Sequence, residues 1–322
     1  MKSTFFVLAL CFAFASCKTS FRITVQEPAI IDLPGEATSF GIINNVNNTN
    51  SPEQSIGSVL NNAKINGNVA AAERMTDGVH RSIENSNSLN SVTIEADSVR
   101  LYGGAINWDY LDTLAAQNDL DGFIEIAEIR TVSPVGGTIA ANVEGKSSSR
   151  LDGTAYINYY VNEGHWARER FVVRKTYRIP TSGSTSILDM LGDVQKKREY
   201  YRALGFELGL RAGRLIYPNW VWVNRKYYNK GSKELKRAAP MIQKGNWDIA
   251  EKQLQYALDN GGKKARARAN YNLALVNEGQ GELDNAIQYA ETAALEYGEK
   301  MANGYLSILR KRKRQMEILR DQ

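Results

Sequence analysis

The sequence predicts an α+β fold, in which a mixed N-terminal α/β domain at residues 17–230 precedes an all-α domain at residues 231–322. Two patterns support this prediction. Apolar and polar side chains alternate over residues 154–179 around a turn at residues 162–164, which is typical of an antiparallel hairpin with one buried face. Residues 231–297 instead repeat apolar side chains every three or four positions between turn signals, as stacked amphipathic helices do.

The other elements of the mixed domain follow from the same kinds of pattern. The run at residues 123–129 is apolar on both faces, so we expect a central strand that helices cover on at least one face. Asn107 precedes a helical period as its N-cap. The expected elements are strands at residues 21–25, 40–46, 123–129 and 220–228 and helices at residues 69–83, 108–117 and 187–215.

Aromatic side chains gather in the last of these strands. Trp220 and Trp222 alternate with Val221 and Val223, which favours a buried strand with both faces covered, against the alternative of a platform for stacking sugar rings.

The start of the chain has the features of a lipoprotein signal peptide. Lys2 provides a positive charge, and residues 5–14 form an apolar stretch that is too short for the ~20 residues of a membrane-spanning helix. Small residues precede Cys17, as a lipoprotein signal peptidase requires, and the site resembles those of Bacteroidota lipoproteins. We therefore expect residues 1–16 to be removed and a lipid on Cys17 to anchor the protein to the outer membrane. The residues after Cys17 lack the acidic cluster associated with surface export in similar lipoproteins, so we expect the protein to face the periplasm.

Cysteine usage and charge exclude several kinds of site. Cys11 lies in the expected signal peptide and Cys17 at its end, so the mature chain has no disulfide, thiol nucleophile or cysteine metal site. A net charge of +5 predicts a mildly basic surface that favours anionic lipid or glycan. Nucleic acid is not an expected partner of an exported protein.

The helical region contains two similar units. Gly245 and Gly281 are separated by 281 − 245 = 36 residues, and small alanines recur at helical spacing after each glycine. These residues resemble the tetratricopeptide repeat (TPR), in which a glycine closes the turn between two helices. Two units do not bury their faces alone, so a terminal helix at residues 299–320 is expected to cap them. The basic run at residues 310–314 fits a solvated face of that helix, and contact with anionic lipid is the alternative.

The resemblance also implies a binding groove. In tetratricopeptide proteins the first helix of each unit lines a concave surface, which here implies that Arg268, Tyr271, Leu275 and Glu278 contact a protein partner of unknown identity. The alternative is that these four residues pack against the preceding domain.

The chain as a whole resembles outer-membrane lipoproteins of unknown function from Bacteroidota that join an α+β domain to C-terminal tetratricopeptide units. More loosely, its order of elements resembles the periplasmic domain of curli-type secretion-pore lipoproteins, in which a hairpin from each protomer helps to build a membrane barrel. Each arm of the hairpin has about the ~9–11 residues of a spanning strand. However, Arg174 and Arg178 on one face and Lys175 on the other leave no clean lipid-facing side.

A search for catalytic groups finds few candidates. The two histidines, His80 and His165, are accompanied by no serine elbow and no glycine-rich phosphate loop. Glu125 and Glu128 lie three positions apart on one expected strand, so they should point to opposite faces and form a poor acid/base pair. We predict no enzymatic activity, no cofactor and no metal.

These observations predict a non-enzymatic envelope lipoprotein that acts as an adaptor or scaffold and binds a protein through its helical repeats. Two alternatives remain, a subunit of a secretion-pore-like assembly and a glycan-binding lipoprotein.

Overall fold

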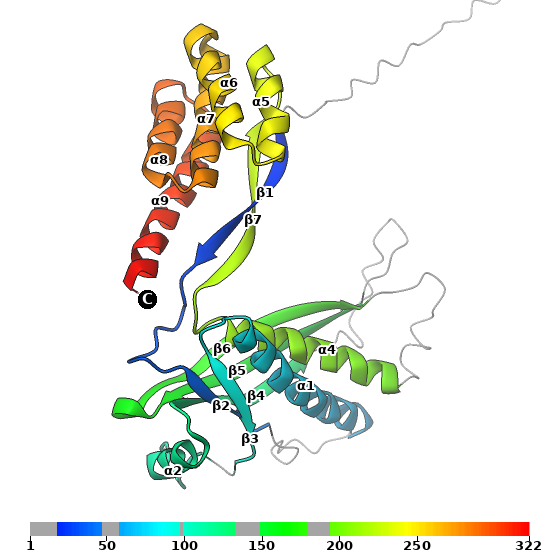
Figure 1. Ribbon diagram of the computed structural model, residues 1–322. Coiled ribbons are helices and arrows are strands. Elements are labelled where there is room, and N and C mark those ends of the chain that lie inside the picture. Colours follow the sequence, from blue (N-terminus) through cyan, green and yellow to red (C-terminus); the bar gives the residue numbers. More distant parts are fainter. Residues whose placement is uncertain (1–17, 47–57, 97–98, 133–148, 180–193, 322) are drawn as a thin grey trace, which may run out of the picture. The chain divides into compact units, whose positions relative to one another are not determined.

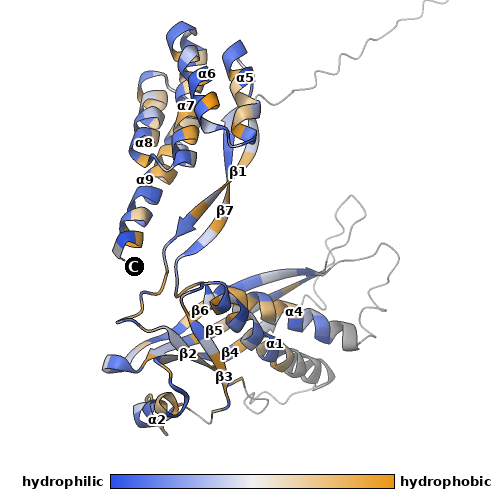
Figure 2. Ribbon diagram, in the orientation of Figure 1, coloured by the Kyte–Doolittle hydropathy of each residue, from blue (hydrophilic) through white to orange (hydrophobic). Residues whose placement is uncertain are grey.

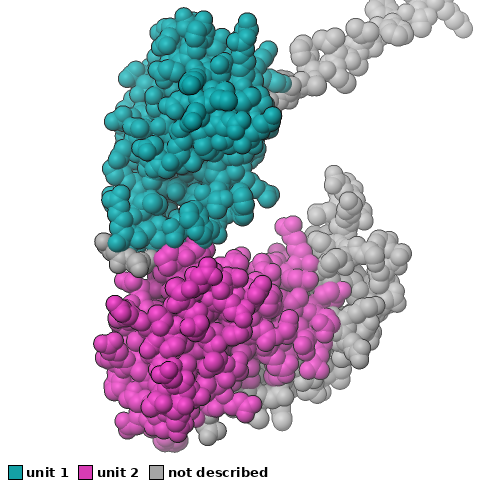
Figure 3. All heavy atoms as spheres, in the orientation of Figure 1, with its two compact units in different colours: residues 1–28, 220–322 teal, residues 29–219 magenta. Residues whose placement is uncertain are grey.

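The computed structural model describes residues 18–46, 58–96, 99–132, 149–179 and 194–321. The chain forms two compact units (Figure 3). Unit 1 combines Met1–Pro28 with Trp220–Gln322, and unit 2 is Ala29–Asn219. The expected α+β class is confirmed, since strands dominate the first part of the chain and helices the last.

Unit 2 is built on a five-stranded sheet (Figure 1). The strand order is β3-β2-β4-β5-β6, with β2 parallel to β3 and β4, and with antiparallel pairs β4-β5 and β5-β6. Only β3 lacks a counterpart in the sequence prediction, because its five residues contain few apolar side chains. The strands are β2 (Ser39–Asn44), β3 (Asn90–Ile94), β4 (Gly122–Val132), β5 (Ser149–Val161) and β6 (Trp166–Ile179), with a short 3-10 turn η1 (Glu163–His165) at the hairpin tip.

Helices cover both faces of the β4 region, where the apolar pattern predicts cover on at least one face. On one face, α1 (Ser58–Glu84) and α4 (Val194–Gly213) pack over a core that includes Ile124, Ile126 and Ile157. On the other face, α2 (Trp108–Asn118) packs over Phe123 and Tyr160. The predicted cap of α2 is confirmed, because the Asn107 side chain accepts a hydrogen bond from the Tyr110 amide at 3.2 Å.

Glycines allow α1 and α4 to approach until their backbones touch. A Cβ atom on Gly205 would lie 1.9 Å from the carbonyl oxygen of Ala71, and one on Gly209 would lie 2.1 Å from that of Met75. Gly213 continues the same four-residue spacing along α4. This Gly-x-x-x-Gly-x-x-x-Gly pattern is a visible signal of close helix packing in the sequence.

A carboxylate joins the beginnings of β2 and β4. Oδ2 of Asp121 accepts hydrogen bonds from the amides of Thr38 (2.8 Å) and Ser39 (2.9 Å) and from both of their hydroxyls. Burial by itself raises the pKa of Asp121, but these hydrogen bonds outweigh burial and the pKa is lowered.

Asp121→Asn should therefore destabilise unit 2 in a pH-dependent manner. We expect a loss on the order of 1–2 kcal/mol in the free energy of unfolding at pH 7, because charge-assisted hydrogen bonds become neutral. A folded pKa below the unfolded value of about 3.9 means that this stabilisation is present above pH ~4 and is lost as pH falls through the folded pKa. Urea unfolding from pH 7 down to pH 2 measures the difference; a gap that stays constant over this range would contradict the assignment.

A β-bulge in β4 determines which of its side chains share a sheet face. In β4, Ala127 is an extra residue, so that Glu125 lies opposite Asn158 and Glu128 lies opposite Tyr156. Asn158 and Tyr156 are two positions apart on β5 and share a face. The expectation that Glu125 and Glu128 point to opposite faces is therefore wrong, because the bulge shifts the alternation by one residue.

Unit 1 consists of a two-stranded ribbon and a helical array (Figure 1). The ribbon pairs β1 (Lys18–Glu27) with β7 (Asn219–Tyr228). Gly245 and Gly281 adopt positive φ values in the turns of two helical hairpins, at the positions that the repeat pattern indicates. The helices are α5 (Lys233–Gln243), α6 (Trp247–Asn260), α7 (Lys263–Gln280), α8 (Leu283–Glu291) and α9 (Lys300–Asp321), with a π-helical turn η2 (Thr292–Glu296) before α9.

The division into units differs from the predicted boundary at residue 230. β1 and β7 belong to unit 1, because they pair with each other and because β7 docks on α7. The Asn272 side chain accepts a hydrogen bond from the Tyr228 amide (2.9 Å) and donates one to its carbonyl (2.7 Å), much as a neighbouring strand would.

Candidate anion-binding face

The four residues predicted to line the repeat groove are in contact with this chain itself. Tyr271 is buried, with ring centroids of Tyr228 at 5.5 Å and Tyr305 at 5.3 Å. Leu275 is fully buried. Arg268 donates to the carbonyl of Lys230 at 2.8 Å, and its guanidinium lies 4.7 Å from the Tyr228 ring centroid. Burial of Tyr271, Leu275 and Glu278 within unit 1 contradicts a free partner groove at these three positions, and the alternative of internal packing describes them.

Glu278 lies at the centre of this filled groove. Its side chain is fully buried and accepts hydrogen bonds from Arg225 Nε (2.8 Å), Arg225 Nη2 (2.7 Å) and the Tyr305 hydroxyl (2.6 Å). Arg312 Nε lies 3.4 Å from the same carboxylate. Burial by itself lowers the pKa of Arg225, but the ion pair with Glu278 outweighs it and the pKa is raised. Burial raises the pKa of Tyr271 to about 12.

The basic run of α9 is only partly a solvated face. Arg310 pairs with Glu291 at 2.7 Å and Lys313 with Asp284 at 2.5 Å, both on the outside of the array. Arg312 instead turns inward to Glu278, and burial lowers its pKa. In Figure 2 the C-terminal half of α9 is mostly hydrophilic, as the composition of the run requires.

A different surface, in unit 2, carries exposed charge. The sheet face opposite α1 and α4 holds five arginines in its β4-β5-β6 part, and no described helix packs over them. We call this surface the arginine face. It comprises Arg130, Arg150, Arg170, Arg174 and Arg178, arranged around Tyr156 and Thr154.

The strand register places these arginines in rows. Thr154 of β5 lies opposite Arg130 of β4 and opposite Arg174 of β6, so the two arginines are two strand spacings, or about 10 Å, apart. Arg150 lies directly opposite Arg178. The face therefore presents guanidinium groups on all three strands.

Tyr156 contacts two of these guanidinium groups. The Cζ atoms of Arg130 on β4 and Arg170 on β6 each lie 5.1 Å from the centroid of the Tyr156 ring. Such contacts hold an arginine in place through its planar face and leave its N–H donors available.

A buried polar network positions Arg170. Glu125 is buried and accepts hydrogen bonds from Asn45 Nδ2, Asn158 Nδ2 and the Tyr160 hydroxyl, each at 2.6 Å. Asn158 Oδ1 in turn accepts the backbone amide of Arg170 at 2.7 Å, within the β6 bulge where Arg170 has a φ of 52°. Glu125, which the sequence indicates to be a poor catalytic group, is thus held by three hydrogen bonds within the fold.

The charge balance of the face is strongly positive. The carboxylates that pair with these arginines are Glu128, with Arg130, and Asp152, with Arg150 at 3.2 Å, whereas Glu169, next to Arg170 in β6, pairs with Arg100 at 2.6 Å. Arg170, Arg174 and Arg178 form no ion pair with any residue that the structure describes. Three of the five guanidinium groups therefore lack a carboxylate partner within the described chain.

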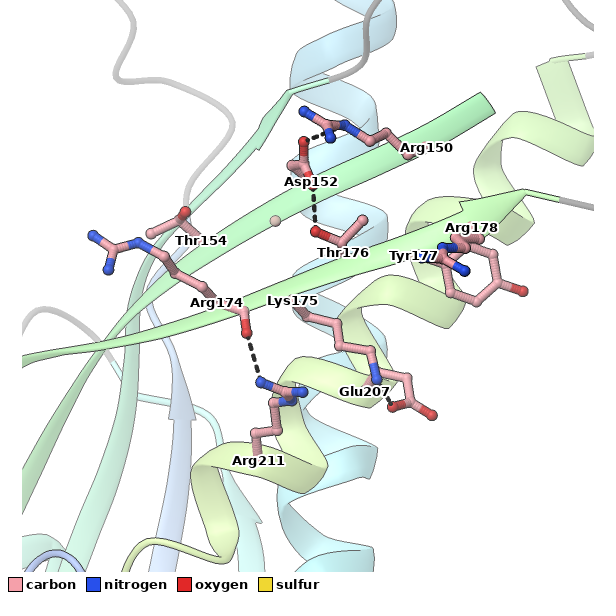
Figure 4. Close-up of a pocket in the computed structure, with 11 residues that line it drawn as sticks. Arg150, Asp152, Thr154, Arg174, Lys175, Thr176, Tyr177, Arg178, Glu207 and Arg211 are labelled. Carbon is pink, nitrogen blue, oxygen red and sulfur yellow. Dashed lines mark hydrogen bonds and ion pairs between the residues drawn. The ribbon is translucent and has the colours of Figure 1, made fainter. Parts of the chain in front are cut away.

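The far end of the arginine face borders an open hollow of about 990 Å³ (Figure 4). Lys175 Nζ pairs with Glu207 Oε2 of α4 at 2.6 Å, and Arg211 donates to the carbonyl of Arg174 at 3.0 Å, which secures the edge strand β6 to α4. The hollow is lined by Arg150, Asp152, Gly153, Thr154, Arg174, Lys175, Thr176, Tyr177, Arg178, Glu207 and Arg211.

Two other residues that the sequence singles out are Cys17 and His165. Cys17, the expected lipid attachment residue, lies outside the described residues. His165 pairs with Asp112 at 2.9 Å and stacks on Trp108, so it joins the hairpin tip to α2. Among the described residues, no group of three or more His, Cys, Asp or Glu side chains is arranged to hold a metal ion. Nor is any described helix long and apolar enough to cross a membrane.

The fold and this face define an α+β protein with an open, basic sheet surface, followed by a helical array. A family model described as Domain of unknown function (DUF8603) matches residues 37–228, which is more than half of the chain. The chain belongs to this family. A second model, Domain of unknown function (DUF6340), matches residues 236–311 within the helical array.

Other comparisons add little. No curated protein matches the chain. A solved structure of a PelC variant dodecamer from Paraburkholderia phytofirmans is 7% identical and covers 59% of this chain and 97% of that chain, with a TM-score of 0.23. That score is too low to indicate a shared fold.

Proposed function

We propose that this protein is a non-enzymatic adaptor of the cell envelope, which is held by a lipid on Cys17 and binds an acidic segment of a partner protein on the arginine face of unit 2. The observation that carries the proposal is the set of five arginines on a sheet surface that no described helix covers, of which only Arg130 and Arg150 pair with a carboxylate of the described chain. The groove of the helical array is less suited to this task, because Tyr271, Leu275 and Glu278 are buried within unit 1.

The side-chain chemistry favours carboxylates as the ligand. A guanidinium group is always charged and presents two parallel N–H donors to a carboxylate, and arginine clusters are a recurrent means of recognising acidic motifs. Thr154 and Thr176 add hydroxyl groups between the arginines. Catalysis is less well supported, since the one buried carboxylate of this face, Glu125, has its hydrogen-bonding capacity taken up by Asn45, Asn158 and Tyr160.

Crosslinking in cells tests the proposal. Val132 is 61% exposed and lies on the arginine face beside Asp152, so a photoreactive residue at this position should capture the partner. Arg174→Glu combined with Arg178→Glu should reduce the adduct about tenfold or more, because like charges would then meet an acidic segment. Arg168→Glu is the matched control: it lies on the same strand, before the bulge, opposite the core residue Tyr159.

Three results would contradict the proposal. The adduct could survive the double charge reversal, or it could be lost equally in Arg168→Glu. The captured peptide could also map to this chain itself, which would mean that the chain covers its own arginine face. A captured acidic segment of another envelope protein, lost only in the double variant and weakened by added salt, is the supporting result.

A further inference from the structure

The β1-β7 ribbon of unit 1 exposes two tryptophans, which corrects the sequence prediction that this strand is covered on both faces. Trp220 is 67% exposed and Trp222 is 70% exposed. Because large aromatic side chains dominate the burial of apolar surface in folded proteins, two neighbouring exposed tryptophans indicate a surface with a partner.

The exposed side chains of the ribbon share one face. On β7 every second residue from Trp220 to Lys226 is exposed, whereas Arg225 and Tyr227 are buried toward the helices. On β1 the buried residues Ile23 and Val25 alternate with exposed ones in the same manner. We call the outward set the ribbon face, and it comprises Trp220, Trp222, Asn224 and Lys226 of β7 with Ser20, Arg22 and Thr24 of β1.

The dimensions of the ribbon face suit a single extended chain. Two ten-residue strands present a surface of roughly 33 Å by 10 Å, or about 330 Å². A stable protein interface buries about 800 Å² on each partner, so a globular protein or a second copy of this chain would have to contact surface beyond the ribbon face as well. A peptide that binds by strand addition would use an edge of the ribbon through its backbone, and not this face of side chains.

The composition of the ribbon face favours a sugar chain. Side chains two positions apart on a strand lie about 6.7 Å from each other, so Trp220 and Trp222 present two indole rings in succession along β7. Each ring offers a flat apolar surface for the C–H face of a pyranose and an N–H donor for a hydroxyl. Asn224, Thr24 and Ser20 add uncharged hydrogen-bonding groups, whereas only Arg22 and Lys226 carry charge.

We propose that the ribbon face is a glycan-binding site, in which Trp220 and Trp222 stack on successive pyranose rings of one extended oligosaccharide and the neighbouring polar side chains bond its hydroxyls. This site lies in unit 1 and is independent of the arginine face. The protein would then have separate surfaces for an acidic protein segment and for a saccharide.

Titration of the full chain with defined oligosaccharides tests the proposal. The probes are cellohexaose, xylohexaose, mannohexaose and a galacturonate hexamer, and the readout is isothermal calorimetry together with tryptophan emission. We expect at least one hexasaccharide to bind and to shift the emission. Trp222→Ala should weaken this binding about tenfold, and Trp222→Phe, which keeps an aromatic ring, should weaken it much less. Tyr256→Ala, which removes an exposed aromatic residue from α6 of the same unit, is the control and should have no effect.

Several outcomes would overturn the proposal. One is the absence of binding for all four hexasaccharides, and another is binding that persists in a Trp220→Ala/Trp222→Ala variant whose circular dichroism shows that it is folded. A third is failure of iodide to quench the emission that is lost in Trp222→Ala, which would show that the ribbon face is covered. Binding to phosphatidylglycerol vesicles that requires both tryptophans would replace the glycan by a membrane surface.

Discussion

Replacing Glu278 with alanine is expected to lower the free energy of unfolding of unit 1 by about 3–5 kcal/mol, because the buried guanidinium groups of Arg225 and Arg312 then lose the carboxylate that they share. Tyr305 would lose its hydrogen-bond acceptor as well. Since Arg225 belongs to β7 and Glu278 to α7, the change should loosen the ribbon from the helices. Hydrogen exchange of α7 peptides across a urea series measures the effect within unit 1.

Two variants make this prediction specific. Glu291→Ala removes the partner of Arg310 on the outside of the array, and it should change the stability by less than about 1 kcal/mol because exposed ion pairs contribute little. Glu278→Gln keeps the shape and one acceptor oxygen, so its loss should lie between the two. A loss in Glu278→Ala no larger than that in Glu291→Ala would show that the filled groove does not depend on this cluster.

The second large effect is expected at the contact between α1 and α4. Gly205→Ala combined with Gly209→Ala would place two methyl groups against backbone atoms, at 1.9 Å from Ala71 O and 2.1 Å from Met75 O. Neither helix relieves these contacts without moving away from the other, so we expect a loss of about 3 kcal/mol or more in the stability of unit 2. Thermal unfolding, with hydrogen exchange of the two helices, measures the change.

Substitution of a glycine in α9 by alanine should have the opposite effect on stability. Gly304 lies on the exposed side of α9, and a Cβ there would meet nothing within 4 Å. Gly304→Ala should therefore stabilise the chain by about 0.5–1 kcal/mol through helix propensity alone. Similar responses at Gly304 and at the α1-α4 pair would show that the glycines of α4 are not there for packing.

Local patterns in the sequence predicted most of the elements. Alternation over the hairpin, the N-cap at Asn107 and the turn glycines Gly245 and Gly281 all correspond to features of the structure. These features depend on neighbours within a few residues, so the sequence of each segment is sufficient to predict them. β3 was missed because short strands with polar side chains form only when a partner such as β2 supplies the hydrogen bonds.

The candidate sites depend on contacts between residues that are far apart in the sequence, so local patterns did not predict them. The arginine face requires two bulges, at Ala127 and at Arg170, that realign three strands, and neither bulge has a marker in the residue pattern. Resemblance to tetratricopeptide repeats implied a free groove at Tyr271 and Glu278, yet Arg225 of β7, far from them in the sequence, occupies it. The exposure of Trp222 also depends on how β1 and β7 pair.

The sequence by itself determined the α+β class, the positions of most helices and strands and the turns between helices, because hydrophobic period, caps and glycine conformations act over a few residues. Only the tertiary structure decided that β1 and β7 belong with the C-terminal helices, that Glu278 is buried in an ion pair, and that five arginines share one open face. Such outcomes depend on contacts between residues tens to hundreds of positions apart, where burial and strand register decide which side chains meet and which stay exposed.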